Sequence, residues 1–293
     1  MKSIEYMGLR CLEMTFGQFS IIVTESVGPR VISLSFGGGE NLFAELPGVK
    51  LESPDAGSYH FYGGHRLWHA PEDPRRTYLP DDLPVKVETI EEGISLTQPV
   101  EAKTGIQKEM QIRFDETVPQ LRISHVLKNF GENSTTLAPW AITQLTPGGI
   151  AVLPQFTGLS DGNGTLPNRS ITLWPYTDIN SPHIEWGNKY ILVRADMENG
   201  KLKIGYPNRE GWLAYWRGPD LFIKRSDYRP GEPYFDFGSS SECYCDPRFL
   251  ELETLGPITT ISSGESVTHQ EIWEVRRVPA WTGDISELDD LFI

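Results

Sequence analysis

Short runs of β-branched and aromatic residues recur along the whole chain, and each is bounded by glycine, proline, asparagine or aspartate. This pattern is typical of strands separated by turns. Examples are FSIIVTES (19–26), KEMQIRF (108–114) and VTHQEIWEV (267–275). No segment longer than about three turns carries an apolar stripe at helical spacing. The sequence therefore predicts an all-β chain of packed antiparallel sheets, either a sandwich or a barrel.

The domain organisation follows from how the turn residues are distributed. The 22 prolines and 28 glycines are spread along the chain, so no change in composition marks a boundary. We expect a single domain over residues 1–293. Two stretches, 46–84 and 156–188, are predicted to be long loops with a functional role over a sheet face. One short helix is expected in TGDISELDDLF (282–292), capped by Asp284 or Ser286.

Charge and cysteine content exclude several classes of function. A formal net charge of −14 disfavours contact with phosphate backbones and anionic lipid surfaces. No leader pattern and no apolar run of eighteen residues is present, so we expect a cytoplasmic protein that binds neither nucleic acid nor membrane. The three cysteines cannot all pair, and their spacing suits no structural zinc site. Reduced thiols are expected.

The stretch FYGGHRLWHAPED (61–73) concentrates titratable and aromatic side chains. Its glycine pair permits a turn, and Pro71 and the following Pro74 limit any helix, so it is predicted to be a loop that brings His60, His65 and His69 together. Imidazole suits proton transfer near neutral pH, and Arg66 could hold a carboxylate, phosphate or hydroxyl. The alternative is that these groups pin a long loop to the sheet through hydrogen bonds.

A metal site is a second alternative for the same stretch. His65 and His69 are four residues apart, and His60 or Glu72 could complete a set of ligands. That spacing places two side chains on one side only in a helix, which the flanking glycines and prolines disfavour. We therefore predict no metal and no cofactor.

The segment FLELETL (249–255) is predicted to be a strand. Period two then places Glu251 and Glu253 on one face, about 7 Å apart, and two leucines on the other. Such a pair could supply a general base or the two acids of a glycosidase, or it could lie on a solvated outer face.

Two other patterns allow both a binding role and a packing role. His125 shares its strand face with apolar residues, so it is either a hydrogen-bonded core histidine or a ligand contact. Trp212 and Trp216 share one face of a predicted strand, where they could stack on a sugar ring or pack in the core.

Five phrases, in order and spacing, resemble the galactose mutarotase-like superfamily, which includes the aldose 1-epimerases. They are GPRVISLSFGGGENLFAE (28–45), FYGGHRLWHAPE (61–72), STTLAPWAITQLTPGG (134–149), FLELETLGP (249–257) and ISSGESVTHQEIWEV (261–275). The GGHRLWHAPE and ELETLGP phrases resemble an uncharacterised branch of it. The resemblance implies an antiparallel β supersandwich with a carbohydrate site on a concave sheet face.

The resemblance also implies a chemistry. In family mutarotases, a glutamate in an L-E-T phrase takes the proton from the anomeric hydroxyl, and Glu253 matches it here. A histidine protonates the ring oxygen, the ring opens, and closure on the other face gives the other anomer without a cofactor. The chain departs from the family at both histidine positions, where it has Trp140 and Tyr62.

We therefore predict a carbohydrate-active protein, an aldose 1-epimerase-like enzyme that interconverts the anomers of a small free or acidic sugar, with Glu253 as base and His65 or His69 as acid. The residues expected to contact the sugar are His60, Tyr62, Arg66, Trp68, His125, Trp140, Gln144 and Glu251. A noncatalytic carbohydrate-binding or regulatory module is the alternative, because both family histidines are absent. A glycoside hydrolase or lyase that uses Glu251 with Glu253 is the third reading.

Overall fold

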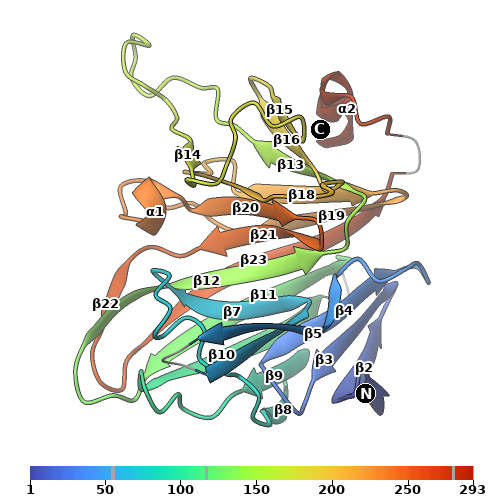
Figure 1. Ribbon diagram of the computed structural model, residues 1–293, viewed down its shortest axis with the longest axis vertical. Helices are drawn as coiled ribbons and strands as arrows, with labels where there is room; N and C mark the ends of the chain where they lie inside the picture. The colour runs from blue at the N-terminus through green and yellow to red at the C-terminus, as the bar shows by residue number, and fades with distance from the viewer. Residues whose placement is uncertain (54–56, 116–117, 279–280, 293) are drawn as a thin grey trace.

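The computed structural model describes residues 1–53, 57–115, 118–278 and 281–292, and they form two large antiparallel sheets packed face to face (Figure 1). The nearly all-β prediction is confirmed. Of the two predicted architectures, the sandwich is the one observed.

The first sheet has eleven strands. In spatial order it consists of β1 (Lys2–Tyr6), β2 (Leu9–Phe16), β3 (Phe19–Thr24), β4 (Arg30–Phe36), β7 (His65–Ala70), β12 (Thr135–Leu145), β21 (Phe249–Leu255), β20 (Ser241–Asp246), β17 (Leu202–Tyr206) and β14 (Thr172–Leu173), with β22 (Thr259–Ile261) paired to β12.

The second sheet has ten strands. In spatial order it consists of β15 (Ile184–Trp186), β16 (Tyr190–Arg194), β13 (Ile150–Pro154), β18 (Trp212–Arg217), β19 (Asp220–Arg225), β23 (Ser266–Arg277), β11 (Gln120–Asn129), β10 (Ile106–Asp115), β9 (Gly93–Thr97) and β8 (Lys86–Ile90).

The main core lies between the two sheets, because each strand turns every second side chain inward. In β10, for example, Ile106, Lys108, Met110 and Ile112 are buried and alternate with partly exposed residues. At the centre, the rings of Phe43 and Phe222 meet Trp273 edge to face, with ring centroids 5.6 and 5.7 Å from it. Packing in this layer fixes which side chains of each strand point inward.

The prediction of a long loop over 46–84 is wrong for most of that stretch. Residues Glu45–Ser53 and Gly57–Gly63 form β5 and β6, a separate two-stranded sheet, and β7 follows at once. Gly64 joins β6 to β7 with φ +70°, and a Cβ there would lie 2.2 Å from the Val31 carbonyl oxygen. The glycine pair thus allows a sharp turn between strands. Residues 54–56 lie outside the described residues, and in the described part of this stretch it is the segment after β7 that lacks regular structure up to β8.

The predictions of a second long loop and of a C-terminal helix agree better with the structure. Residues 156–188 contain only the short strands β14 and β15. The C-terminal segment forms a 3₁₀ turn, η1 (Ile285–Glu287), and α2 (Leu288–Phe292), with Asp284 accepting a hydrogen bond from the Ser286 N–H as the cap. A third short helix, α1 (Phe235–Gly238), precedes β20.

The C-terminal segment covers the face of the second sheet that turns away from the first sheet. Trp212 and Trp216 pack there in a cluster with Trp281 and Leu288, and the Trp216 Nε1–H donates to the Val278 carbonyl. Packing in a core therefore accounts for this tryptophan pair. Within the described residues, no helix has the length and apolar character needed to cross a membrane.

Candidate functional site

The face of the first sheet that turns away from the second sheet carries a compact set of charged and aromatic side chains. Register pairing aligns Gln144 with Glu251 and Tyr244 in one row across β12, β21 and β20. The neighbouring row aligns Glu253 with Glu242. Because paired residues share a face, these side chains form one continuous surface. We call it the outer face.

A cavity of about 240 Å³ lies on the outer face. We call it the outer-face pocket. Its aromatic walls come from Phe61, Trp68, Tyr78, Trp140, Trp174, Tyr176, Tyr244 and Phe249. Its charged lining consists of Arg66, Glu72, Lys201, Lys203, Arg248 and Glu251. Trp174 and Tyr176 belong to the predicted loop 156–188, and Glu72 and Tyr78 to the irregular segment after β7.

Glu251 is the acid at the base of this pocket. Its Oε1 accepts from Arg66 Nη2 and from Gln144 Nε2, each at 3.0 Å. Burial raises the pKa of Glu251 to about 7, partly offset by the Arg66 guanidinium. A carboxyl group in this range can hold or release a proton near neutral pH. Arg66 in turn stacks over the Trp68 ring at 4.2 Å.

Glu253 lies deeper than Glu251 and is fully buried. Its Oε2 accepts from the Trp140 Nε1–H at 2.7 Å and from Lys203 Nζ at 2.9 Å. Lys203 also pairs with Glu242 at 2.6 Å. Burial raises the pKa of Glu242 well above its ordinary value. The Trp140 indole and the Lys203 ammonium therefore stand between Glu253 and the pocket, where both line the wall.

Strand β7 places on opposite sides of the sheet residues that were expected from the sequence to lie together. Arg66 and Trp68 point to the outer-face pocket, whereas His65 and His69 point to the other side of the sheet. A strand alternates its side chains, so the loop expected to bring an acid histidine beside Glu253 does not do so. Among the described residues that line the pocket, none is a histidine.

His65 belongs to a buried polar network between the sheets. Its Nε2 lies 2.7 Å from His125 Nε2, and its Nδ1 lies 2.9 Å from Thr143 Oγ1. Burial lowers the pKa of His65 well below its usual value and that of His125 to about 3. The two rings are therefore neutral at physiological pH. His125 is thus a hydrogen-bonded interior histidine and lies outside the pocket.

Glu271 joins this network beside the two rings. Atoms of His65, His125 and Glu271 that could ligate a metal lie within 4.8 Å of one another. Lys224 Nζ lies 2.9 Å from Glu271 Oε1 and already neutralises it, and it also donates to three oxygens of the first sheet. A fixed ammonium beside the ligands opposes a second cation. The metal-ligand pair considered as an alternative from the sequence, His65 with His69, is not part of this cluster, which contains His65 but not His69.

Two other expected contacts lie on β6, away from the outer-face pocket. His60 Nδ1 is 3.2 Å from the Tyr62 hydroxyl, and Arg30 stacks over the Tyr62 ring at 5.3 Å. Between them, Phe61 lines the pocket. Of the eleven residues predicted for the site, the structure places Arg66, Trp68, Trp140 and Glu251 in the lining, with Gln144 and Glu253 directly behind it.

Sequence reasoning missed Lys203, Glu242 and Trp174. The alternation that identified Glu251 and Glu253 also occurs in KLKIGY (201–206) and SECYCD (241–246), where charged residues interrupt apolar runs. That signal could have found Lys203 and Glu242. Which strands lie beside β21 is a long-range property, and the loop position of Trp174 carries no periodic signal.

No protein-family model and no curated protein matches the sequence. Among solved structures, a galactose mutarotase-like protein from Lactobacillus casei is similar over 91% of this chain and 100% of its own, with 12% identity and a TM-score of 0.54. An Escherichia coli K12 protein provisionally described as an aldose 1-epimerase has the same identity and TM-score, over 92% of this chain and 100% of its own.

A TPR-domain containing protein from Parabacteroides distasonis is also similar, with 12% identity and a TM-score of 0.63. The match covers 95% of this chain but spans only 50% of that protein. At such low identity these similarities establish the fold and nothing finer. The chain has the antiparallel β-sandwich fold of galactose mutarotase-like proteins.

Proposed function

We propose that this protein binds a carbohydrate in the outer-face pocket. The observation that carries the proposal is the lining itself, in which indole and phenol rings surround hydrogen-bonding groups on Arg66, Glu251 and Lys203. Sugars present apolar C–H faces that stack on aromatic rings and hydroxyls that need polar partners. The fold shared with proteins described as mutarotase-like supports the same class of ligand.

The size of the pocket favours a single sugar ring. At about 240 Å³ it is smaller than the pockets of roughly 300–1,000 Å³ that hold drug-sized ligands. Three of the four cations in the lining already pair with carboxylates: Arg66 with Glu251, Lys203 with Glu242 and Glu253, and Arg248 with Asp246. Lys201 is the lining cation placed to contact a negative group on a sugar.

Interconversion of anomers is the second candidate, and the raised pKa of Glu251 favours it. In this scheme the Glu251 carboxylate takes the proton of the anomeric hydroxyl. The C1=O1 double bond forms as the C1–O5 bond breaks, and water protonates the ring oxygen. Rotation about C1–C2 and the reverse steps give the other anomer. Glu253, screened by Trp140 and Lys203, acts in this scheme by positioning those two groups.

Nuclear magnetic resonance on the full chain tests both candidates. Saturation-transfer spectra with hexoses, pentoses, uronic acids and sugar phosphates report binding, and two-dimensional exchange spectra report anomer interconversion. We expect binding of at least one monosaccharide. If the protein is also an enzyme, exchange should be lost in Glu251→Gln. Binding without exchange leaves a carbohydrate-binding module, and the absence of any binding overturns the proposal.

If exchange is lost in Glu253→Gln but not in Glu251→Gln, Glu253 is the general base. Both variants keep the side-chain shape, so the comparison separates the two glutamates without creating a cavity.

A further inference from the structure

A second cavity lies on the opposite side of β7 from the outer-face pocket. It measures about 520 Å³ and opens at the end of the sandwich where β7, β10 and β12 meet the loops around residues 71–76 and 101–105. We call it the rim pocket. Its lining consists of His69, Arg75, Arg76, Lys103, Thr104, Ile106, Thr135 and Leu137. Since His69 and Trp68 point to opposite sides of the strand, the two pockets are separate.

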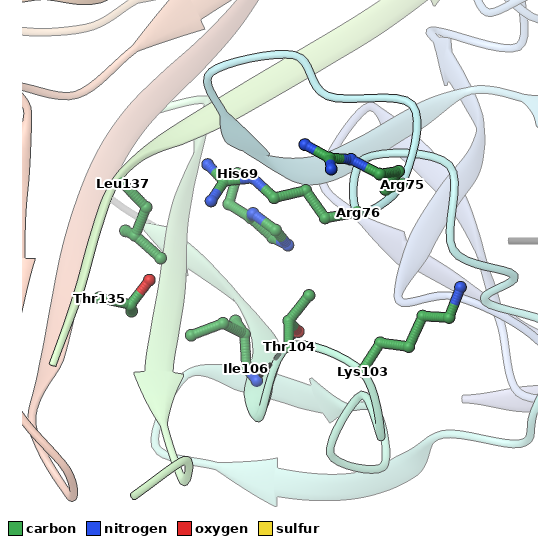
Figure 2. A pocket seen from close by; sticks show the side chains of 8 residues that line it. All are labelled: His69, Arg75, Arg76, Lys103, Thr104, Ile106, Thr135 and Leu137. Atoms are coloured by element: carbon green, nitrogen blue, oxygen red, sulfur yellow. Dashed lines mark hydrogen bonds between the residues drawn. The ribbon is translucent and has the colours of Figure 1, made fainter. Parts of the chain in front are cut away.

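The rim pocket is positively charged in a protein whose net charge is −14. Arg75, Arg76 and Lys103 all line it, and no acidic residue does so in the described part of the chain. Figure 2 shows the His69 ring in the middle of the pocket, with Arg75 and Arg76 on one side and Lys103 on the other. Like charges gathered around one cavity repel unless an anion separates them.

Arg76 leaves part of its hydrogen-bonding capacity unused. Its Nη2 donates to the Ala70 carbonyl at 3.2 Å, but its Nε is buried without a partner in the described structure. Over the same residues Arg76 forms no salt bridge, whereas Arg75 pairs with Asp73 at 3.0 Å. A guanidinium that lacks a carboxylate partner is a ready site for an oxyanion.

His69 supplies a second unused polar group. Its side chain is 2% exposed, and its Nε2 lies 3.3 Å from Glu101 Oε2. Burial lowers the pKa of His69, so the neutral ring that donates Nε2–H to Glu101 presents an Nδ1 lone pair. That Nδ1 is buried and has no partner among the described residues. A ligand hydroxyl would satisfy it.

Glu101 does not cancel the positive charge of the pocket. Lys108 Nζ lies 2.6 Å from its Oε1. Burial alone would raise the pKa of Glu101, but Lys108 and His69 outweigh this and hold it below its ordinary value. The carboxylate is thus already neutralised from inside the sandwich, so it does not offset the positive charge of Arg76 at the rim.

We propose that the rim pocket binds a small hydroxylated anion, with its phosphoryl or carboxylate group at Arg76, Arg75 and Lys103 and a hydroxyl group on His69 Nδ1. The cavity is too large for an inorganic ion alone. The apolar side chains of Ile106 and Leu137 line the rest of it and can contact the carbon skeleton.

Calorimetric titration of the full chain with glucose 6-phosphate, gluconate, inorganic phosphate and glucose tests this proposal. We expect at least one organic anion to bind more tightly than phosphate or glucose. Arg76→Gln should weaken that binding at least tenfold. Arg122→Gln is the matched control, because it removes the same charge from a surface ion pair with Asp115. Lys103→Gln, at an exposed site, gives a second test if Arg76→Gln lowers the melting temperature.

Lys201→Gln distinguishes the two pockets, because Lys201 lines only the outer-face pocket. Anion binding that survives Lys201→Gln but falls in Arg76→Gln supports the rim pocket, whatever the result for neutral sugars. The proposal fails if no anion binds. It also fails if Arg76→Gln and Lys103→Gln bind like the wild type, or if phosphate alone binds as tightly as the organic anions.

Discussion

Lys203 and Glu253 form an ion pair 2.9 Å long at the base of the outer-face pocket, and Glu242 approaches the same ammonium to 2.6 Å. All three side chains are almost fully removed from water. Burial alone would lower the pKa of Lys203, but the two carboxylates outweigh it and raise that pKa well above its usual value. The charges of this trio therefore depend on one another.

Replacing Lys203 with methionine should destabilise the protein. The change leaves Glu242 and Glu253 buried without their cation, and breaking a buried pair in this way costs about 3–5 kcal/mol. Urea unfolding measures the loss. Adding Glu253→Gln to Lys203→Met should restore part of it. The matched control is Lys189→Met, which removes an exposed ion pair with Asp289 and should change little. Equal effects of the two single variants would contradict the prediction.

Glu251 should make stability depend on pH. Its pKa is raised to about 7 in the folded protein, against about 4.3 in an unfolded chain. The folded state then binds more protons between these values, so this contribution to stability is complete below about pH 4 and is lost as pH rises through about 7. We expect Glu251→Gln to remove about 1–3 kcal/mol of the decline in unfolding free energy between pH 5 and pH 8. Parallel pH profiles for wild type and variant would refute this.

Trp174 should contribute to sugar binding more than to folding. It is half-buried on a loop and lines the pocket beside Lys203, whose ammonium lies 4.7 Å from its ring centroid. Trp174→Ala should weaken the affinity for the bound sugar about tenfold, or about 1.4 kcal/mol, with a small change in melting temperature. Trp186→Ala is the control, because Trp186 is 39% exposed and lies outside the pocket. Similar losses of affinity in both variants would argue against stacking at Trp174.

Gly64 should tolerate no side chain. A Cβ there would lie 2.2 Å from the Val31 carbonyl oxygen, at a residue with φ +70°. Gly64→Ala therefore adds a backbone clash to left-handed strain, and we expect a loss of about 3 kcal/mol or more. Gly38→Ala isolates the strain, because φ is +72° and nothing lies within 4 Å of the added carbon. Thermal unfolding of both variants gives the comparison, and comparable melting temperatures would show that the turn can shift.

Local periodicity explains what the sequence could predict. The faces of the strand 249–255 follow from alternation alone, and the structure places Leu250 and Leu252 in the core with both glutamates opposite. The prediction of a loop over 61–73 is wrong, although its glycine pair and Pro71 are typical of a loop. In the fold, Gly63 ends β6, Gly64 makes the turn, and Pro71 directly follows β7.

The rest of the site depends on contacts between distant segments. Lys203 meets Glu253 because β20 pairs with both β17 and β21, and no local signal in the sequence specifies that order. Trp174 reaches the pocket through the short pairing of β14 with β17. The rim pocket is likewise lined by segments distant in sequence, His69 in β7 of the first sheet and Lys103 in the loop before β10 of the second.

The alternation along β7 has a consequence for how this protein could change during evolution. Even positions, Arg66 and Trp68, serve one cavity, and His69 serves another on the opposite side of the same strand. Inserting or deleting one residue just before His65 would exchange the two sets, so that imidazoles would enter the outer face and a guanidinium would enter the interior. The ligand preferences of the two cavities can therefore diverge by substitution, while the length of the chain at this turn is constrained by both at once.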